Sequence, residues 1–154
     1  MKKYYSNLTS LTKIVSKHKN NNKIIGLTNG CFDLLHDGHK KLINESKKNC
    51  DYLIVAVNAD NSVKKLKGKN RPFHDLNKRI ENLKKISSID AIISFADETP
   101  LEIINAVIPD ILLKGSDYYG KEIVGSDVVL KNGGTIKLIE IIRGISTTII
   151  SKNL

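Results

Sequence analysis

Two histidines on either side of a glycine, His36 and His39 around Gly38, have the spacing best suited to chemistry in this 154-residue chain. They open an amphipathic segment at 37–48, so we expect them at the start of a helix. Residues three apart share one side of a helical turn, near the backbone N–H groups and the positive end of the helix dipole. Imidazoles placed there suit a phosphoryl group, and glycine allows phosphates to approach the backbone. A surface pair is the alternative, and a zinc pair lacks a third ligand in spacing.

Three hydroxyl-bearing residues near the C-terminus form a second candidate anion site. Ser146, Thr147 and Thr148 follow Arg143 and a predicted strand at 135–142. Serine is a favoured helix-capping residue, so we expect Ser146 to begin a short last helix. The hydroxyls and free N–H groups at that helix start would cradle an anion. An ordinary serine cap explains the same residues.

Two further loops carry charged and small residues directly after predicted strands. After the strand at 52–57 come Asn58, Asp60, Lys64, Lys67 and Arg71. After the strand at 111–113 come Lys114, Gly115 and Asp117. Each loop alone is better explained as a solvated surface loop than as a site, but all four loops would meet at one rim of a parallel sheet.

The elements that position these loops alternate between strands and helices. Apolar runs rich in Ile, Val and Leu predict five strands, at 23–28, 52–57, 90–95, 111–113 and 135–142. Helical spacing and caps predict helices over 37–48, 76–87, 99–107 and 122–131, and a helical N-terminal extension within 1–22. We therefore expect an α/β chain whose residues 23–154 form a single Rossmann-like domain. It would have a five-stranded parallel sheet, helices on both faces and a ligand at the carboxyl ends of the strands.

Composition narrows the class of partner. The net charge of +9 favours acidic ligands, but only three basic residues are arginine and aromatic residues make up 5%, so we expect no nucleic-acid partner. No segment is apolar enough for a membrane span or a signal peptide, which makes the cytoplasm the expected location. Cys31 and Cys50 have no paired spacing, and we expect neither a disulfide nor a catalytic thiol.

The ordered motifs resemble the nucleotidyltransferase superfamily, which carries HxGH after its first strand and an ISTT-type motif late in the chain. Here these motifs read HDGH at 36–39 and ISTT at 145–148. Within the superfamily the chain is most similar to bacterial D-glycero-β-D-manno-heptose 1-phosphate adenylyltransferases, in their stand-alone form. The similarity runs from about Lys23 to Ile150 through TNGCFDLLHDGH, VNAD, SVKKLKG, FADETP, PDILLKGSDY, IVGSDVV, NGGT and STTII.

This resemblance implies attack of a heptose 1-phosphate oxygen on the α-phosphorus of ATP, giving ADP-heptose and pyrophosphate. It implies that His36 and His39 contact the α-phosphate and that Asp33 orients a histidine or a Mg²⁺-bound water. Mg²⁺ would accompany ATP without fixed protein ligands. The implied nucleotide-binding residues are Thr28, Asn29, Gly30, Phe32, Gly38, Lys114, Gly115, Asp117, Ser146, Thr147 and Thr148. The implied sugar- or phosphate-binding residues are Asn58, Asp60, Lys64, Lys67, Arg71, Arg79 and Arg143.

Several alternatives stay open at this point. Arg79 matches a functional arginine of the related cytidylyltransferases, but a surface charge on a helix explains it equally. Arg143 directly precedes Gly144, whereas glycerol-3-phosphate cytidylyltransferases have an arginine further ahead of ISTT. Such a cytidylyltransferase, or an FAD synthetase, is the alternative enzyme, and a nucleic-acid-binding domain is the alternative class. The resemblance also implies a heptose kinase as a separate upstream enzyme and allows a homodimer.

Overall fold

One mixed sheet organises the chain. The computed structural model describes the backbone of residues 2–142 and 146–152 and the side chains of residues 2–140. The sheet has the order β1-β4-β3-β2-β5-β6-β7. Its strands are β1 (Tyr4–Tyr5), β2 (Ile25–Gly30), β3 (Tyr52–Asn58), β4 (Ala91–Phe95), β5 (Ile111–Gly115), β6 (Thr135–Ile142) and β7 (Ser146–Lys152). All neighbours pair in parallel except β6 and β7, which are antiparallel.

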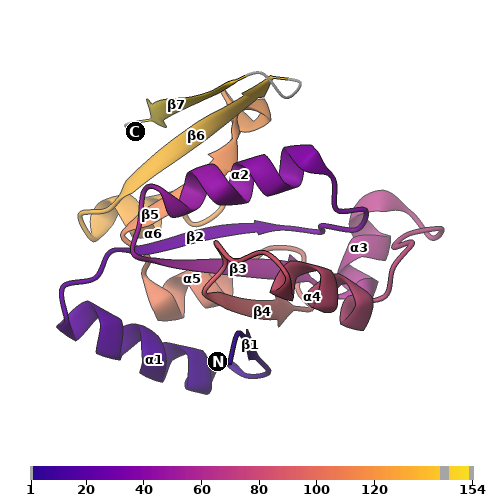
Figure 1. The fold of residues 1–154 in the computed structure, drawn as a ribbon, viewed down its shortest axis with the longest axis horizontal. Helices are drawn as coiled ribbons and strands as arrows, with labels where there is room; N and C mark the ends of the chain where they lie inside the picture. Colours follow the sequence, from indigo (N-terminus) through magenta and orange to yellow (C-terminus); the bar gives the residue numbers. More distant parts are fainter. Residues whose placement is uncertain (1, 143–145, 153–154) are drawn as a thin grey trace.

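Helices cover both faces of this sheet, as predicted (Figure 1). On one face α1 (Leu8–Asn20), α5 (Leu101–Val107) and α6 (Ser126–Lys131) contribute to one hydrophobic cluster. On the other face α2 (Asp37–Lys47) and α4 (Leu76–Lys84) contribute to a second cluster. Every residue of β3 is buried, as expected for a strand covered on both sides.

The strand order places a crevice at the carboxyl ends of β2 and β5. From β2 the chain moves outward through β3 to β4, and then returns to the other side of β2 to form β5 and β6. The loops that leave β2 and β5 therefore diverge, and ligands of open α/β sheets bind at such a point. The helix α3 (Asp60–Lys67) and the 3₁₀ turn η1 (Ser116–Tyr118) follow β3 and β5 in the chain.

The prediction of five parallel strands is correct for β2 to β6 but incomplete. The two-residue β1 adds an edge beside β4, and β7 adds an antiparallel edge beside β6. The predicted helix beginning at Ser146 is wrong, because residues 146–152 form β7. This stretch contains Thr147, Thr148, Ile149 and Ile150, whose β-branched side chains favour strands.

The helices also differ from the prediction, by one additional helix and by shifted boundaries. The loop expected after β3 is largely the helix α3, and α5 begins at Leu101 after Pro100 rather than after a Thr99 cap. The helix expected over 122–131 begins only at Ser126. Gly125 before it has φ +87°, a left-handed conformation that interrupts a right-handed helix.

The N-terminal residues pack onto the sheet. Leu11 and Val15 of α1 are buried in the first cluster, and the Lys3 ammonium donates to the backbone carbonyls of Lys84 and Ile86. None of the described helices is long and apolar enough to cross a bilayer.

Candidate active site

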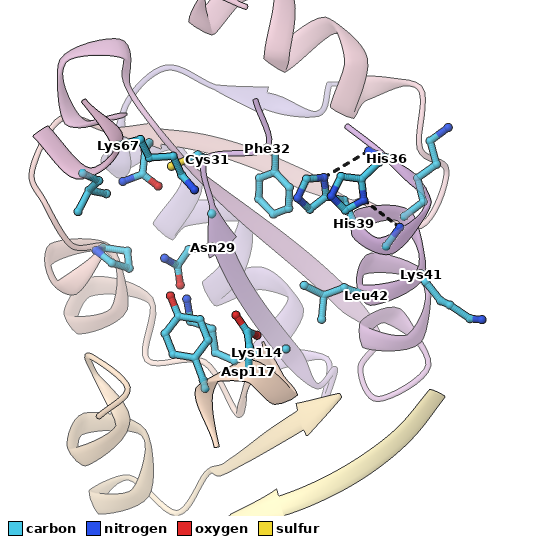
Figure 2. Close-up of a pocket in the computed structure, with 18 of the residues that line it drawn as sticks. Asn29, Cys31, Phe32, His36, His39, Lys41, Leu42, Lys67, Lys114 and Asp117 are labelled. Carbon is cyan, nitrogen blue, oxygen red and sulfur yellow. Dashed lines mark hydrogen bonds between the residues drawn. The ribbon is translucent and has the colours of Figure 1, made fainter. Parts of the chain in front are cut away.

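A cleft of about 1320 Å³ lies at the carboxyl ends of β2 and β5 (Figure 2). Asn29 and Gly30 line it from β2, and Lys114 and Gly115 line it from β5. The first turns of α2 and the end of α3 form other parts of its wall. Small-molecule pockets usually measure about 300–1,000 Å³, so this cleft is larger than a typical site for one small molecule.

The two histidines of the HDGH motif form a stacked pair at the start of α2. His36 is the residue before the helix, and its Nδ1 accepts the Gly38 N–H at 3.1 Å. His39 Nδ1 in turn accepts the His36 N–H at 3.3 Å. The ring centroids are 3.8 Å apart, and both rings line the cleft (Figure 2). The pair thus forms a reciprocal capping box in which two imidazoles replace the usual hydroxyl and carboxylate.

This capping arrangement determines which ring nitrogen carries the proton. A nitrogen that accepts a backbone N–H has no proton of its own, so the proton of each neutral ring lies on Nε2. Burial, with smaller effects from His36 and Lys67, lowers the pKa of His39 to about 4, against an opposing effect of the Leu34 carbonyl. His39 is therefore neutral at pH 7 and can offer an Nε2–H donor at the positive end of α2.

Gly38 and Phe32 hold this pair in place. A Cβ added to Gly38 would lie 2.9 Å from Cε1 of His36, so any larger residue would displace the ring. Phe32 is buried, has the unusual φ of +49°, and meets His39 edge-on with centroids 5.4 Å apart. Backbone conformations of this kind persist where the surrounding packing enforces them.

Most of the predicted nucleotide-binding residues gather at the cleft. Those that line it are Asn29, Gly30, Phe32, Gly38, Lys114, Gly115 and Asp117. Thr28 does not line it, because its side chain is fully buried inside β2. Its Oγ1 has no hydrogen-bond partner among the described residues.

The hydrogen bonds of Asp33 go to other groups than the two histidines, and its predicted action on a Mg²⁺-bound water stays a prediction. Its buried carboxylate accepts the N–H groups of Phe73 and His74 at 2.8 and 2.9 Å and the Arg71 Nε–H at 2.7 Å. Burial alone would raise the pKa of Asp33, but these hydrogen bonds hold it below its usual value. Asp33 and Arg71 therefore hold the loop before α4 in place.

Arg79 is neither a surface charge nor a lining residue of the cleft. Its side chain is fully buried and donates to the carbonyls of Cys31, Asn58 and His74 at 2.9, 2.6 and 3.0 Å. Its remaining nitrogen forms an ion pair with Asp60 at 2.7 Å. Arg79 thus joins the loops after β2 and β3, both of which reach the cleft.

The other predicted phosphate-binding residues divide by position. Asn58 and Lys67 line the cleft, whereas Lys64 is exposed on α3 and does not line it. Arg143 lies outside the described residues, as do the side chains of Ser146, Thr147 and Thr148. Since the backbone from Ser146 forms a strand, the predicted helix start is wrong, while anion binding by these hydroxyls stays a prediction.

The cleft also contains residues that the sequence reasoning did not select. They are Cys31, Asp37, Lys40, Lys41, Leu42, Asn44, Leu66, Glu98, Thr99, Pro100, Tyr118, Glu122 and Val124. Tyr118 directly follows Asp117, and the FADETP motif contains Glu98, Thr99 and Pro100, so neighbouring motif residues were the available signal. Asp37 likewise lies inside the HDGH motif. The later α2 residues, from Lys40 onward, lack such a signal, because they lie in the ordinary polar pattern of a helix.

Cys31 faces the cleft as a neutral thiol. It is half-buried, and burial raises its pKa, so it is a poor nucleophile. We expect Cys31→Ala to retain kcat and substrate affinity, and we expect the same for Cys50→Ala, whose thiol has a pKa raised by burial to about 11. Steady-state kinetics with a melting curve for each variant tests this. A folded but inactive Cys31→Ala protein would show that the thiol takes part in the chemistry.

Known proteins are similar to this chain in sequence and in fold. The family model described as "Cytidylyltransferase-like" matches residues 27–153. The "Bifunctional protein HldE" of Granulibacter bethesdensis is 45% identical over 92% of this chain, and that of Caulobacter vibrioides is 51% identical over 80%. These alignments cover 29% and 26% of the relatives, so the chain spans less than a third of their length.

Solved structures give the same picture. A lipopolysaccharide core biosynthesis protein from Thermoplasma volcanium superposes with a TM-score of 0.63 and 31% identity, over 79% of this chain and 98% of that protein. A pantoate-beta-alanine ligase from Francisella tularensis has a TM-score of 0.68 at 14% identity, over 93% of this chain and 68% of that protein, which shows a shared fold alone. With its paired histidines at the start of α2, this chain belongs to the cytidylyltransferase-like family.

Proposed function

We propose that this chain transfers the adenylyl group of ATP to D-glycero-β-D-manno-heptose 1-phosphate, giving ADP-heptose and pyrophosphate. The stacked His36–His39 pair carries this proposal, because it presents ring N–H groups at a helix start inside a cleft larger than a typical site for one small molecule. The heptose substrate rests on the resemblance of the whole motif series. The similarity to HldE proteins and to a lipopolysaccharide core biosynthesis protein supports it.

In this reaction a phosphate oxygen of the sugar phosphate attacks the α-phosphorus of ATP. A new P–O bond forms as the bond between the α-phosphorus and the bridging oxygen breaks, and pyrophosphate leaves with that electron pair. No covalent bond to the protein is needed, so the protein acts by positioning and charge stabilisation. The Nε2–H groups of His36 and His39 would donate to the α-phosphate oxygens, where negative charge builds in the transition state.

Mg²⁺ would reach the site together with ATP. Among the described residues, no three His, Cys, Asp or Glu side chains gather into a metal site. We propose a cation that keeps several waters and binds mainly to the substrate phosphates. Bound there, Mg²⁺ would neutralise part of the triphosphate charge, while the histidines act on the α-phosphate.

The cleft also supports assignments for the second substrate. Lys67 lines it from the end of α3, and Asn58 lines it from the end of β3. Both lie on the β3 side of β2, and Lys114 and Asp117 lie on the β5 side. We therefore propose Lys67 as the residue of the basic loop that meets the sugar phosphate or the pyrophosphate, in preference to Lys64 and Arg71.

We expect ATP to be preferred over CTP with the same acceptor, because the loops after β3 and β5 resemble those of the adenylyltransferases. Pyrophosphate release measured with each nucleotide against heptose 1-phosphate, glycerol 3-phosphate and FMN tests both substrates at once. The highest kcat/KM should belong to ATP with heptose 1-phosphate. A higher value for CTP with glycerol 3-phosphate, or for ATP with FMN, would replace the proposed function with that alternative.

A further inference from the structure

Lys114 is a nearly buried cation on the floor of the cleft. It occupies the end of β5, and only 7% of its surface is exposed. Its Nζ lies 4.6 Å from the centre of the Tyr118 ring. Figure 2 shows Lys114 and Asp117 close together in the cleft, with Asn29 of the neighbouring strand beyond them.

The described residues provide no ion pair for this ammonium group. The salt bridges of this part of the chain involve other lysines and arginines. Asp117 is the nearby carboxylate, but its Oδ1 is turned against Gly115, where an added Cβ would lie 2.7 Å away. A buried charge without a bonded counter-charge is costly, so a ligand anion that reached Lys114 would recover free energy.

We propose that the Lys114 ammonium pairs with a phosphate group of a bound substrate, and that this phosphate completes an ion pair that the protein leaves open. The inference rests on the proposed function, in which ATP and the acceptor both bring phosphates. An aromatic ring beside Lys114 adds a cation–π contact but no counter-charge, so the phosphate remains the stronger partner.

The surroundings of Lys114 predict a proton linkage. The groups that face it are Asp117 and Tyr118 from η1 and Cys31 from the loop after β2. The Lys121 Nζ lies 5.9 Å from the centre of the same Tyr118 ring. Burial lowers the pKa of Lys114 to about 8, and Asp117 and Cys31 oppose this shift. Burial raises the pKa of Cys31 and of Tyr118, so both stay neutral in this range. A bound phosphate favours the charged lysine, so binding at pH 8 should take up about half a proton.

Calorimetric titration at pH 8, in two buffers with different ionisation enthalpies, measures both affinity and proton uptake. Three probes are titrated separately: a non-hydrolysable ATP analogue with Mg²⁺, heptose 1-phosphate and inorganic pyrophosphate. We expect Lys114→Met to weaken at least one probe by about 10- to 100-fold and to abolish its proton uptake. Lys114→Arg should retain the affinity. The probe affected identifies which phosphate meets Lys114.

The exposed Lys131 at the end of α6 provides a matched control, since Lys131→Met removes the same charge outside the cleft. The melting temperature separates a binding role from a structural one. Lys114→Met should keep or raise the melting temperature, because an unpaired buried charge is removed. If Lys114 instead had a structural role, the same variant would have a lower melting temperature.

Unchanged affinities and proton uptake for all three probes in Lys114→Met would overturn this inference, even if the unmodified enzyme makes ADP-heptose. If the unmodified protein binds pyrophosphate through Lys114 but shows no adenylyl transfer, the proposed function fails and the phosphate-pairing role stands. Failure of the unmodified protein to bind any of the three probes would overturn both.

Discussion

Replacing His36 or His39 with alanine will lower kcat by about 10²–10³-fold, while KM for ATP changes far less. Each ring has its proton on Nε2 because Nδ1 accepts a backbone N–H. Each alanine variant therefore loses one preorganised donor to the α-phosphate. Removing one such donor to a developing oxyanion costs rate by about this factor. The interaction strengthens in the transition state, so ground-state binding suffers less. Steady-state kinetics on both variants measures the split.

The capping role of the two rings makes a second pair of variants necessary. Alanine at position 36 removes the cap of α2, a loss that typically costs about 0.5–2 kcal/mol of stability. Asparagine at position 36 is a good cap, and glutamine at position 39 suits the third helical position of a capping box. We expect His36→Asn and His39→Gln to retain the melting temperature but not kcat.

Histidine removal elsewhere provides the control. His18 lies in the last turn of α1, where it packs against Tyr52 on the opposite side of the sheet from α2. His18→Ala should leave kcat unchanged. A folded His39→Gln enzyme with near-normal kcat would show that the ring is only a cap, and the proposed reaction would lose its main support.

The sequence was sufficient for the parts of the fold that depend on local pattern. The apolar runs of β2 to β5 are mostly buried on both faces, so their composition distinguishes them from half-exposed strands. The HDGH spacing likewise placed both histidines at a helix start. The C-terminal strand was predicted wrongly as a helix, because two signals competed there. A serine suited to capping favoured a helix, and four β-branched residues favoured a strand.

The hydrogen-bond partners of Asp33 and Arg79 could not be predicted from the sequence, for a different reason. Asp33 meets Arg71, Phe73 and His74 about forty positions further along the chain, and Arg79 meets Cys31 across 48 positions. Neither spacing corresponds to a helical or strand period, so no local pattern predicts the contact. A charged residue beside a motif then resembles a ligand-binding group, although its partners are other parts of the protein.

Because Arg79 joins the loops after β2 and β3, we expect Arg79→Met to lower the free energy of unfolding by about 2–4 kcal/mol, mainly through its lost hydrogen bonds. Asp60 is 42% exposed, so the ion pair itself adds little. Three carbonyl oxygens lose their buried donor, and methionine fills the space but donates nothing. Urea denaturation followed by circular dichroism measures the change.

The neighbouring residue supplies the control for this variant. Lys78 is exposed on the same helix, and Lys78→Met should shift the free energy by no more than about 0.5 kcal/mol. Arg79→Lys should fall between the two, because one ammonium group cannot reach all four partners of the guanidinium. An Arg79→Met protein that unfolds at the wild-type urea concentration would mean that the loops after β2 and β3 hold their positions without this side chain. The arginine would then need another explanation, such as a substrate that reaches it when the loops move.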